Sequence, residues 1–144
     1  MDLQPRVVGV DYGARRVGVA LADPLRLTVR PVGTFAPGEA LAALARLVEE
    51  EGVGVIVVGW PLTDDGGEGR AVDRVRPFLG RLKKAAPGAD VVVQDERESS
   101  RRALGQLVEA GVSKKRRRQK GTLDAAAACV ILQDWLDEQA AGLG

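Results

Sequence analysis

Short apolar runs open the chain and predict a β-hairpin followed by a third strand. The runs Val7–Val10 and Val17–Ala22 flank a turn-prone segment that contains Gly13, which is the pattern of two antiparallel strands. A third strand is predicted over Leu27–Phe35. Pro31 places that strand at an edge or makes it irregular, because proline cannot donate a hydrogen bond within a sheet.

The rest of the chain alternates strands with helices. The continuous apolar runs Val55–Val58 and Val91–Val93 are typical of parallel strands covered on both faces. Apolar residues at helical spacing predict four helices: Glu39–Glu51, a second around Val72, Val75, Phe78, Leu79 and Leu82, a third capped by Ser99 or Ser100 with Ala103, Leu104, Leu107 and Val108 inward, and Thr122–Glu138. This order predicts one α/β domain over residues 1–144, with a mixed five-stranded sheet and helices on its faces.

The composition limits which side chains are available for catalysis and metal binding. The 144 residues include no histidine and one cysteine, which excludes histidine general bases, histidine metal sites and internal disulfides. Cys129 lies in the apolar run AAAACVIL and is predicted to be a core residue. Catalysis would therefore depend on carboxylates, hydroxyls, lysine, arginine or a bound ion. We expect a cytoplasmic protein without a membrane partner, because no leader and no apolar run of about 18 residues is present.

Positive charge is concentrated in one short segment. The formal net charge is +1, yet Lys114–Lys120 (KKRRRQK) holds six of the 21 basic residues, leaving 15 basic against 20 acidic residues elsewhere. Such a run is commonly a solvated, disordered segment. Its position directly before the last helix favours a loop that grips nucleic-acid phosphates.

Four acidic residues stand at the ends of predicted elements. Asp11 ends the first strand, Asp95 and Glu96 end the last one, and Asp124 begins the last helix near its apolar face. Taken singly, each has an ordinary structural explanation, as a turn, a surface residue or a first-turn acid. Taken together, they predict a site, because sites in such sheets form at the carboxyl ends of adjacent strands. Gathered carboxylates suit Mg²⁺ or Mn²⁺.

Four motifs in order resemble those of the YqgF/RuvX family of pre-16S rRNA nucleases and Holliday-junction-resolvase-like proteins. They are GVDYGARRVGVAL, VVGWPLTDDGGEG, QDERESSRRA and KGTLDAAAACVIL. Two positions depart from the family pattern: Trp60 replaces an aliphatic residue and Glu98 an apolar one. The resemblance spans almost the whole chain and implies a ribonuclease H-like fold.

The resemblance also implies an activity and a set of site residues. The expected activity is metal-dependent hydrolysis of phosphodiester bonds by a hydrolase acting on ester bonds, with Asp11, Glu96 and Asp124 as catalytic metal ligands and Mg²⁺ or Mn²⁺ as the cofactor. Asp95 is the second choice beside Glu96, because neighbouring strand residues face opposite ways. The predicted nucleic-acid-binding residues are Lys114, Lys115, Arg116, Arg117, Arg118, Lys120 and Arg97.

Three functional alternatives remain open at this stage. The implied substrate is structured RNA, at the 5′ end of the small-subunit rRNA precursor; the competing substrate is a four-way DNA junction. The chain is expected to be a monomer or a weak homodimer, and junction resolution would need two sites and hence the dimer. A non-catalytic nucleic-acid-binding module is the second class of function. A kinase-like nucleotide-binding protein is the least favoured, because it would need two such domains.

Overall fold

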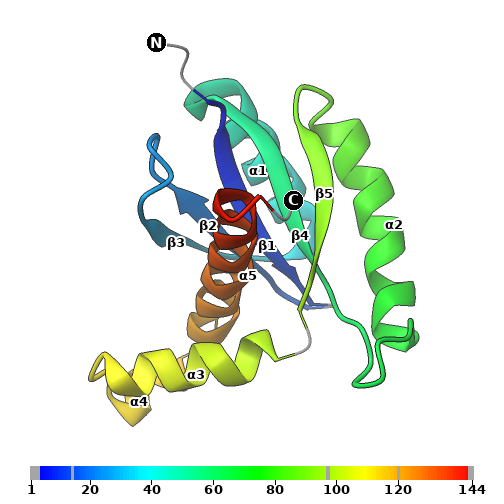
Figure 1. The fold of residues 1–144 in the computed structure, drawn as a ribbon. Helices are drawn as coiled ribbons and strands as arrows, with labels where there is room; N and C mark the ends of the chain where they lie inside the picture. Colours follow the sequence, from blue (N-terminus) through cyan, green and yellow to red (C-terminus); the bar gives the residue numbers. More distant parts are fainter. Residues whose placement is uncertain (1–3, 14, 97, 120, 143–144) are drawn as a thin grey trace.

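The computed structural model describes residues 4–13, 15–96, 98–119 and 121–142. Five strands and five helices make up this part of the chain (Figure 1). They are β1 (Arg6–Tyr12), β2 (Val17–Ala22), β3 (Val29–Phe35), α1 (Pro37–Glu51), β4 (Val53–Trp60), α2 (Arg70–Ala85), β5 (Asp90–Asp95), α3 (Ser99–Glu109), α4 (Lys114–Arg117) and α5 (Thr122–Ala140).

The strands form the predicted mixed sheet, in the order β3-β2-β1-β4-β5. β1 and β2 pair antiparallel, as do β2 and β3, while β4 runs parallel to β1 and to β5. The carboxyl ends of β1, β4 and β5 therefore lie at the same edge. Because β3 is an edge strand, Pro31 is tolerated there as expected.

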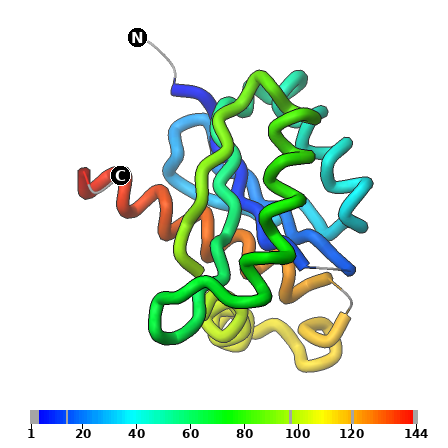
Figure 2. The backbone as a smooth tube through the Cα atoms, turned by 90° about the vertical axis from the view of Figure 1, so that its right-hand side faces the viewer, coloured from blue at the N-terminus to red at the C-terminus, as the bar shows by residue number. Residues whose placement is uncertain are grey.

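Helices cover both faces of the sheet, as the view in Figure 2 shows. On one face, Leu44 of α1 and Phe78 of α2 pack with Val8, Val10 and other residues of the sheet. On the opposite face, α5 packs its own apolar residues against the sheet; the buried members of this second core are Val7, Ala20, Ala22, Val57, Ala128, Ile131, Leu132 and Leu136. Cys129 packs beside this core as predicted, and its burial raises the pKa of the thiol to about 11.

Two strands differ from the prediction. β3 begins at Val29 instead of Leu27, because the backbone N–H groups of Leu27 and Thr28 donate to the Asp23 carboxylate in the preceding turn. The prediction that Val91–Val93 is covered on both faces is wrong, since β5 is an edge strand and Val93 is 47% exposed.

The third and fourth helices differ as well. α3 packs through Ala103 against Ala127 and Val130 of α5, so Leu104 and Val108, predicted to face inward, are 44% and 52% exposed. The basic run, expected to be a loop or disordered, contains the short helix α4, which Ser113 caps by accepting a hydrogen bond from the Arg116 N–H. None of the described helices is both long enough and apolar enough to span a membrane.

Candidate active site

Asp11 projects from the sheet face that α5 covers. Along β1, Val7 packs in the α5 core, and a side chain at Gly9 would collide with Leu132 of α5. Because side chains alternate along a strand, Asp11 shares this face with Val7 and Gly9. It stands one residue before the end of β1, beyond the apolar core.

Asp124 is brought to Asp11 by a glycine on the neighbouring strand. Asp11 pairs directly with Gly18 of β2, and a Cβ atom at Gly18 would lie 2.0 Å from the backbone oxygen of Asp124. The first turn of α5 thus packs directly against the backbone of Gly18, beside Asp11. Gly121 precedes this turn with φ +92°, a left-handed conformation suited to glycine, and its carbonyl accepts a hydrogen bond from Thr34 Oγ1 at 2.7 Å.

Glu96 reaches the same place from β5, across β4. A Cβ atom at Gly59 of β4 would lie 2.6 Å from Glu96 Cγ and 2.6 Å from Ile131 Cδ1 of α5. The Glu96 side chain therefore crosses Gly59 on the α5 face. The Glu96 N–H also donates to the Trp60 carbonyl at 3.1 Å, which extends the pairing of β4 and β5 by one residue.

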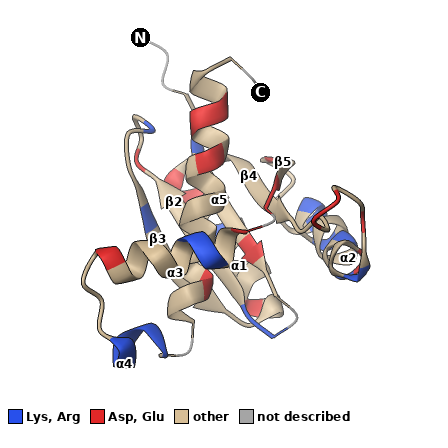
Figure 3. Cartoon of the chain, turned by 60° about the horizontal axis from the view of Figure 1, so that its bottom comes forward, with Lys and Arg blue, Asp and Glu red and all other residues tan. Residues whose placement is uncertain are grey.

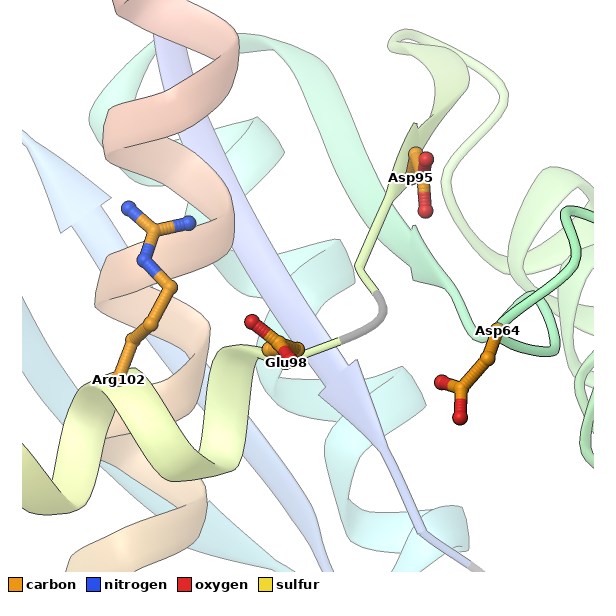
Figure 4. Close-up of a pocket in the computed structure, with 4 residues that line it drawn as sticks. All are labelled: Asp64, Asp95, Glu98 and Arg102. Atoms are coloured by element: carbon orange, nitrogen blue, oxygen red, sulfur yellow. The ribbon is translucent and has the colours of Figure 1, made fainter.

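Asp95 points away from this group, to the other side of the strand. Gln94 bonds to Glu138 of α5 at 3.0 Å, so Gln94 and Glu96 share the α5 face and Asp95 does not. Asp95 instead lines an open pocket with Asp64, Glu98 and Arg102 (Figure 4). The arrangement favours Glu96 over Asp95 as the partner of Asp11.

The electrostatics of Asp11 reflect this gathering of carboxylates. Burial raises the pKa of Asp11 to about 7, with further contributions from repulsion by Glu96 and by Asp124. Burial also raises the pKa of Glu96, while the hydrogen bond from Ser99 opposes that shift and repulsion from Asp95 adds to it. Three acidic side chains from three elements thus share one electrostatic neighbourhood.

Two residues that the sequence analysis did not assign to the site hold these acids. Arg16, directly before β2, donates from Nε to Asp124 Oδ2 at 2.8 Å. Ser99, which was expected to cap α3, is buried and donates its hydroxyl to Glu96 Oε2. Glu98 occupies the N-cap position of α3 instead. The position of Arg16 after the turn gives only a weak signal in sequence, because exposed arginines are common in turns.

The donor set fits a divalent cation by its chemistry. Carboxylate oxygens without histidine or cysteine suit Mg²⁺ and Mn²⁺, and a cation would relieve the repulsion at Asp11. Within the described ranges, no three such side chains are already arranged to hold a metal ion directly. Asp124 accepts the Arg16 bond on Oδ2 and Glu96 accepts the Ser99 bond on Oε2, so each carboxylate could ligate a cation through its other oxygen while keeping its partner.

The basic run lies next to the start of α5. Lys114, Lys115, Arg116 and Arg118 are exposed, whereas Arg117 is half-buried and donates to the Val112 carbonyl at 2.8 Å. Figure 3 shows α4 as a blue segment at the end of the molecule where α5 begins. Arg97 and Lys120, also predicted to bind nucleic acid, lie outside the described residues.

Trp60 anchors the glycine-rich loop that joins β4 to α2, residues 61–69. Its indole N–H donates to Glu68 Oε2 at 3.0 Å, and the Arg76 guanidinium stacks on its ring at 5.3 Å. Arg76 also pairs with Glu68. Trp60, which stands where the family pattern has an aliphatic residue, therefore connects the end of β4 to the loop and to α2.

Comparisons with known proteins agree with the resemblance found in the sequence. A family model described as RuvX, Holliday junction resolvase, matches residues 5–138. A protein of Salinibacter ruber is 49% identical over 137 residues, covering 95% of this chain and 96% of that protein. One of Chlorobaculum tepidum is 43% identical, covering 92% and 93%. Both are named "Putative pre-16S rRNA nuclease".

Solved structures share the fold at low sequence identity. RuvC of T. thermophilus in complex with a Holliday junction substrate has a TM-score of 0.60 and 17% identity, over 97% of this chain and 98% of that one. Fowlpox virus resolvase, bound to junction DNA, has a TM-score of 0.57 and 9% identity, over 93% and 98%. The α/β, ribonuclease H-like fold class predicted from the sequence is confirmed.

Proposed function

Because the chain belongs to the RuvX family, we propose that it is a metal-dependent nuclease that hydrolyses phosphodiester bonds at the 5′ end of pre-16S rRNA. The observation that carries the proposal is the gathering of Asp11, Glu96 and Asp124 on one face at the carboxyl ends of β1 and β5 and the start of α5. The names of relatives that match over nearly their whole length supply the RNA substrate.

Asp11, Glu96 and Asp124 would hold the divalent cation, with Mg²⁺ or Mn²⁺ proposed. When bound, such ions activate a water molecule and stabilise the leaving oxygen of a phosphodiester. Asp11 has to be ionised to serve as a ligand; burial and the neighbouring carboxylates raise its pKa to about 7 in the metal-free protein, and a bound cation would favour its ionised form. Arg16 and Ser99 orient the Asp124 and Glu96 carboxylates before substrate arrives.

The remaining part of the site would bind the sugar–phosphate backbone. The exposed cations of α4 precede the helix that carries Asp124, so a strand bound by them would pass close to the acids. Aromatic residues make up 3% of the chain, which makes contact with phosphates a better source of affinity than base stacking. Arg97 and Lys120 are proposed to contribute on the basis of the sequence alone.

A four-way DNA junction is the second candidate substrate. The description of the family model as a Holliday junction resolvase favours it. Cutting a junction symmetrically requires two active sites and therefore a dimer, whereas trimming RNA requires one. The two substrates consequently predict different oligomeric states during turnover.

The test compares cleavage of labelled pre-16S rRNA 5′ fragments and four-way DNA junctions, with Mg²⁺, Mn²⁺ or EDTA. Wild type is measured beside Asp11→Asn and beside Asp90→Asn, which removes an exposed carboxylate at the opposite end of β5. We expect metal-dependent RNA cleavage by wild type and Asp90→Asn, and none by Asp11→Asn.

Other results would change the assignment in definite ways. Cleavage of junctions alone would move the function to DNA recombination. Binding without cleavage by all three proteins would make the chain a nucleic-acid-binding module. Equal cleavage by Asp11→Asn and wild type would remove Asp11 from catalysis.

A further inference from the structure

A pocket on the β1–β2 side of the acids has no role in the site described so far. It has a volume of about 340 Å³ and is lined by Arg15, Arg16, Thr34, Phe35 and Ala36. Arg15 and Arg16 precede β2, Thr34 and Phe35 end β3, and Ala36 is the N-cap of α1. The lining therefore comes from the β1–β2 turn and from the β3–α1 junction, both distant from α4 in the sequence.

Two hydrogen bonds join this pocket to the start of α5. Arg16 Nε donates to the Asp124 carboxylate at 2.8 Å, and Thr34 Oγ1 donates to the Gly121 carbonyl at 2.7 Å. The pocket thus adjoins the segment that positions Asp124. A ligand in it would lie beside the carboxylates without replacing any of them.

The lining residues favour an anion. Two are arginines, and none is acidic. Arg16 bonds to Asp124 through Nε, so the two terminal nitrogens of its planar guanidinium can donate to a ligand, and a guanidinium group matches phosphate oxygens well. Arg15 is exposed, and its side chain makes no hydrogen bond or ion pair with another described residue.

The start of α1 adds to this preference. Ala36 is the N-cap of this 15-residue helix and supplies no side-chain hydrogen bond to the first turn. The positive end of the helix dipole therefore lies at the pocket, offset in part by Glu39 in the first turn of α1. Phe35 supplies an apolar surface on which a ribose or a base could pack.

We propose that this pocket binds a backbone phosphate of the nucleic-acid substrate, next to the phosphodiester that is cleaved at the three acids. Arg15 is the main phosphate ligand. Arg16 has two functions, since it donates to the phosphate and also holds Asp124. The proposal rests on the proposed function, because it needs a nucleic-acid substrate, but it gives a role to Arg15 and Arg16, which lie in the motif GVDYGARRVGVAL and had been assigned none.

Arg15 provides the clean test, because it does not contact the acids. Binding of a fluorescein-labelled pre-16S rRNA 5′ fragment is measured by fluorescence anisotropy in EDTA over a series of salt concentrations. We expect Arg15→Ala to weaken binding about 3- to 10-fold and to lower the slope of log K against log salt by about one. Arg81→Ala, which removes an exposed cation near the end of α2, should change neither value.

A second experiment locates the contact on the strand. In a set of oligonucleotides, each carries one neutral methylphosphonate linkage at a different position near the cleavage site. One linkage should weaken binding to wild type, and Arg15→Ala should show no further loss at that linkage. A merely structural effect of Arg15→Ala would lower binding equally at every position.

The outcomes separate the two proposals. If wild type binds RNA and Arg15→Ala behaves like Arg81→Ala, the phosphate subsite is wrong while the nuclease function stands. If wild type binds neither RNA nor junction DNA, the proposed function fails, and the subsite fails with it. A methylphosphonate effect that is identical in wild type and Arg15→Ala also overturns the subsite.

Discussion

Asp11 is held in the fold at an electrostatic cost. Its pKa of about 7 exceeds the ordinary value of 3.8 because the side chain is buried and repelled by Glu96 and Asp124. A raised carboxyl pKa means that folding favours the protonated form. The contribution of this proton to the free energy of unfolding is present in full at a pH below 3.8 and is lost as the pH rises through 7. A difference of about three units corresponds to about 4 kcal/mol.

We therefore predict that Asp11→Asn stabilises the metal-free protein at alkaline pH. In EDTA at pH 8, the free energy of unfolding by urea should exceed that of wild type by up to about 4 kcal/mol. At pH 5, where Asp11 is already mostly protonated in the folded state, the two proteins should differ far less. Asp90→Asn serves as the control, and a gain at pH 8 no larger than that at pH 5 would contradict the assignment.

At the scale of elements, the site depends on how closely α5 approaches the sheet. Three glycines lie under α5, one each on β1, β2 and β4: Gly9, Gly18 and Gly59. A Cβ atom at each would lie within 2.7 Å of an α5 atom or of the Glu96 side chain. Because these positions carry no side chain, α5 packs directly against the backbone of the strands. The position of Asp124 relative to Asp11 follows from this contact.

We predict that Gly18→Ala disrupts both stability and the site. The added methyl group would lie 2.0 Å from the Asp124 carbonyl oxygen, so the first turn of α5 has to move, at a cost of about 1–3 kcal/mol or more. Gly80→Ala is the matched control: it lies inside α2 with nothing within 4 Å and should stabilise by about 0.5–1 kcal/mol. Thermal unfolding of both variants checks this, and a stable Gly18→Ala protein with wild-type metal affinity would refute it.

The charge of α4 should act on binding and leave the fold unchanged. We predict that replacing Lys114, Lys115, Arg116 and Arg118 by glutamine lowers the slope of log K against log salt by about three for single-stranded RNA. The melting temperature should stay close to that of wild type, because these side chains are exposed. Arg117 is retained, since it bonds to the Val112 carbonyl.

The control for this prediction removes charge elsewhere. Lys83 and Lys84, in the last turn of α2, are replaced by glutamine in the same way. Equal losses of RNA affinity per charge removed, four charges in α4 and two in α2, would show that α4 contributes only net charge and not a binding surface.

At the scale of the whole molecule, the hydrophobic pattern was sufficient to predict the sheet and the position of the acids. Strand ends and the start of the last helix could be located from apolar periodicity, so Asp11, the neighbours Asp95 and Glu96, and Asp124 were identified as a group. The choice between Asp95 and Glu96 required the register of β5, which the Gln94–Glu138 bond reveals. Their catalytic role stays a prediction.

Other features depend on tertiary contacts that periodicity does not encode. The inward face of α3 was predicted correctly at Ala103 and wrongly at Leu104, which is exposed because the helix packs on α5 through the small residue Ala103. The ion pair of Arg16 with Asp124 joins residues 108 positions apart, and no local pattern in the sequence indicates such a contact.

These properties together predict that divalent cations close most of the stability gap between Asp11→Asn and wild type. Without metal, the variant is the more stable protein at pH 8, since it lacks the repelled carboxylate. Cation binding to the folded state adds about 2.7 kcal/mol at a concentration 100-fold above Kd, and this gain requires ionised Asp11. Wild type should therefore show a rise in Tm of several degrees with Mg²⁺ or Mn²⁺ at pH 8, while Asp11→Asn shows almost none.

The pH dependence gives this prediction its internal control. Because Asp11 must lose its proton before it ligates a cation, the rise in Tm of wild type should shrink as the pH falls from 8 to 6, across the pKa of about 7. Asp90→Asn should follow wild type throughout. A cation effect of equal size in Asp11→Asn, or one that does not change with pH, would place the bound ion away from Asp11 and would separate the metal dependence of the protein from the three gathered acids.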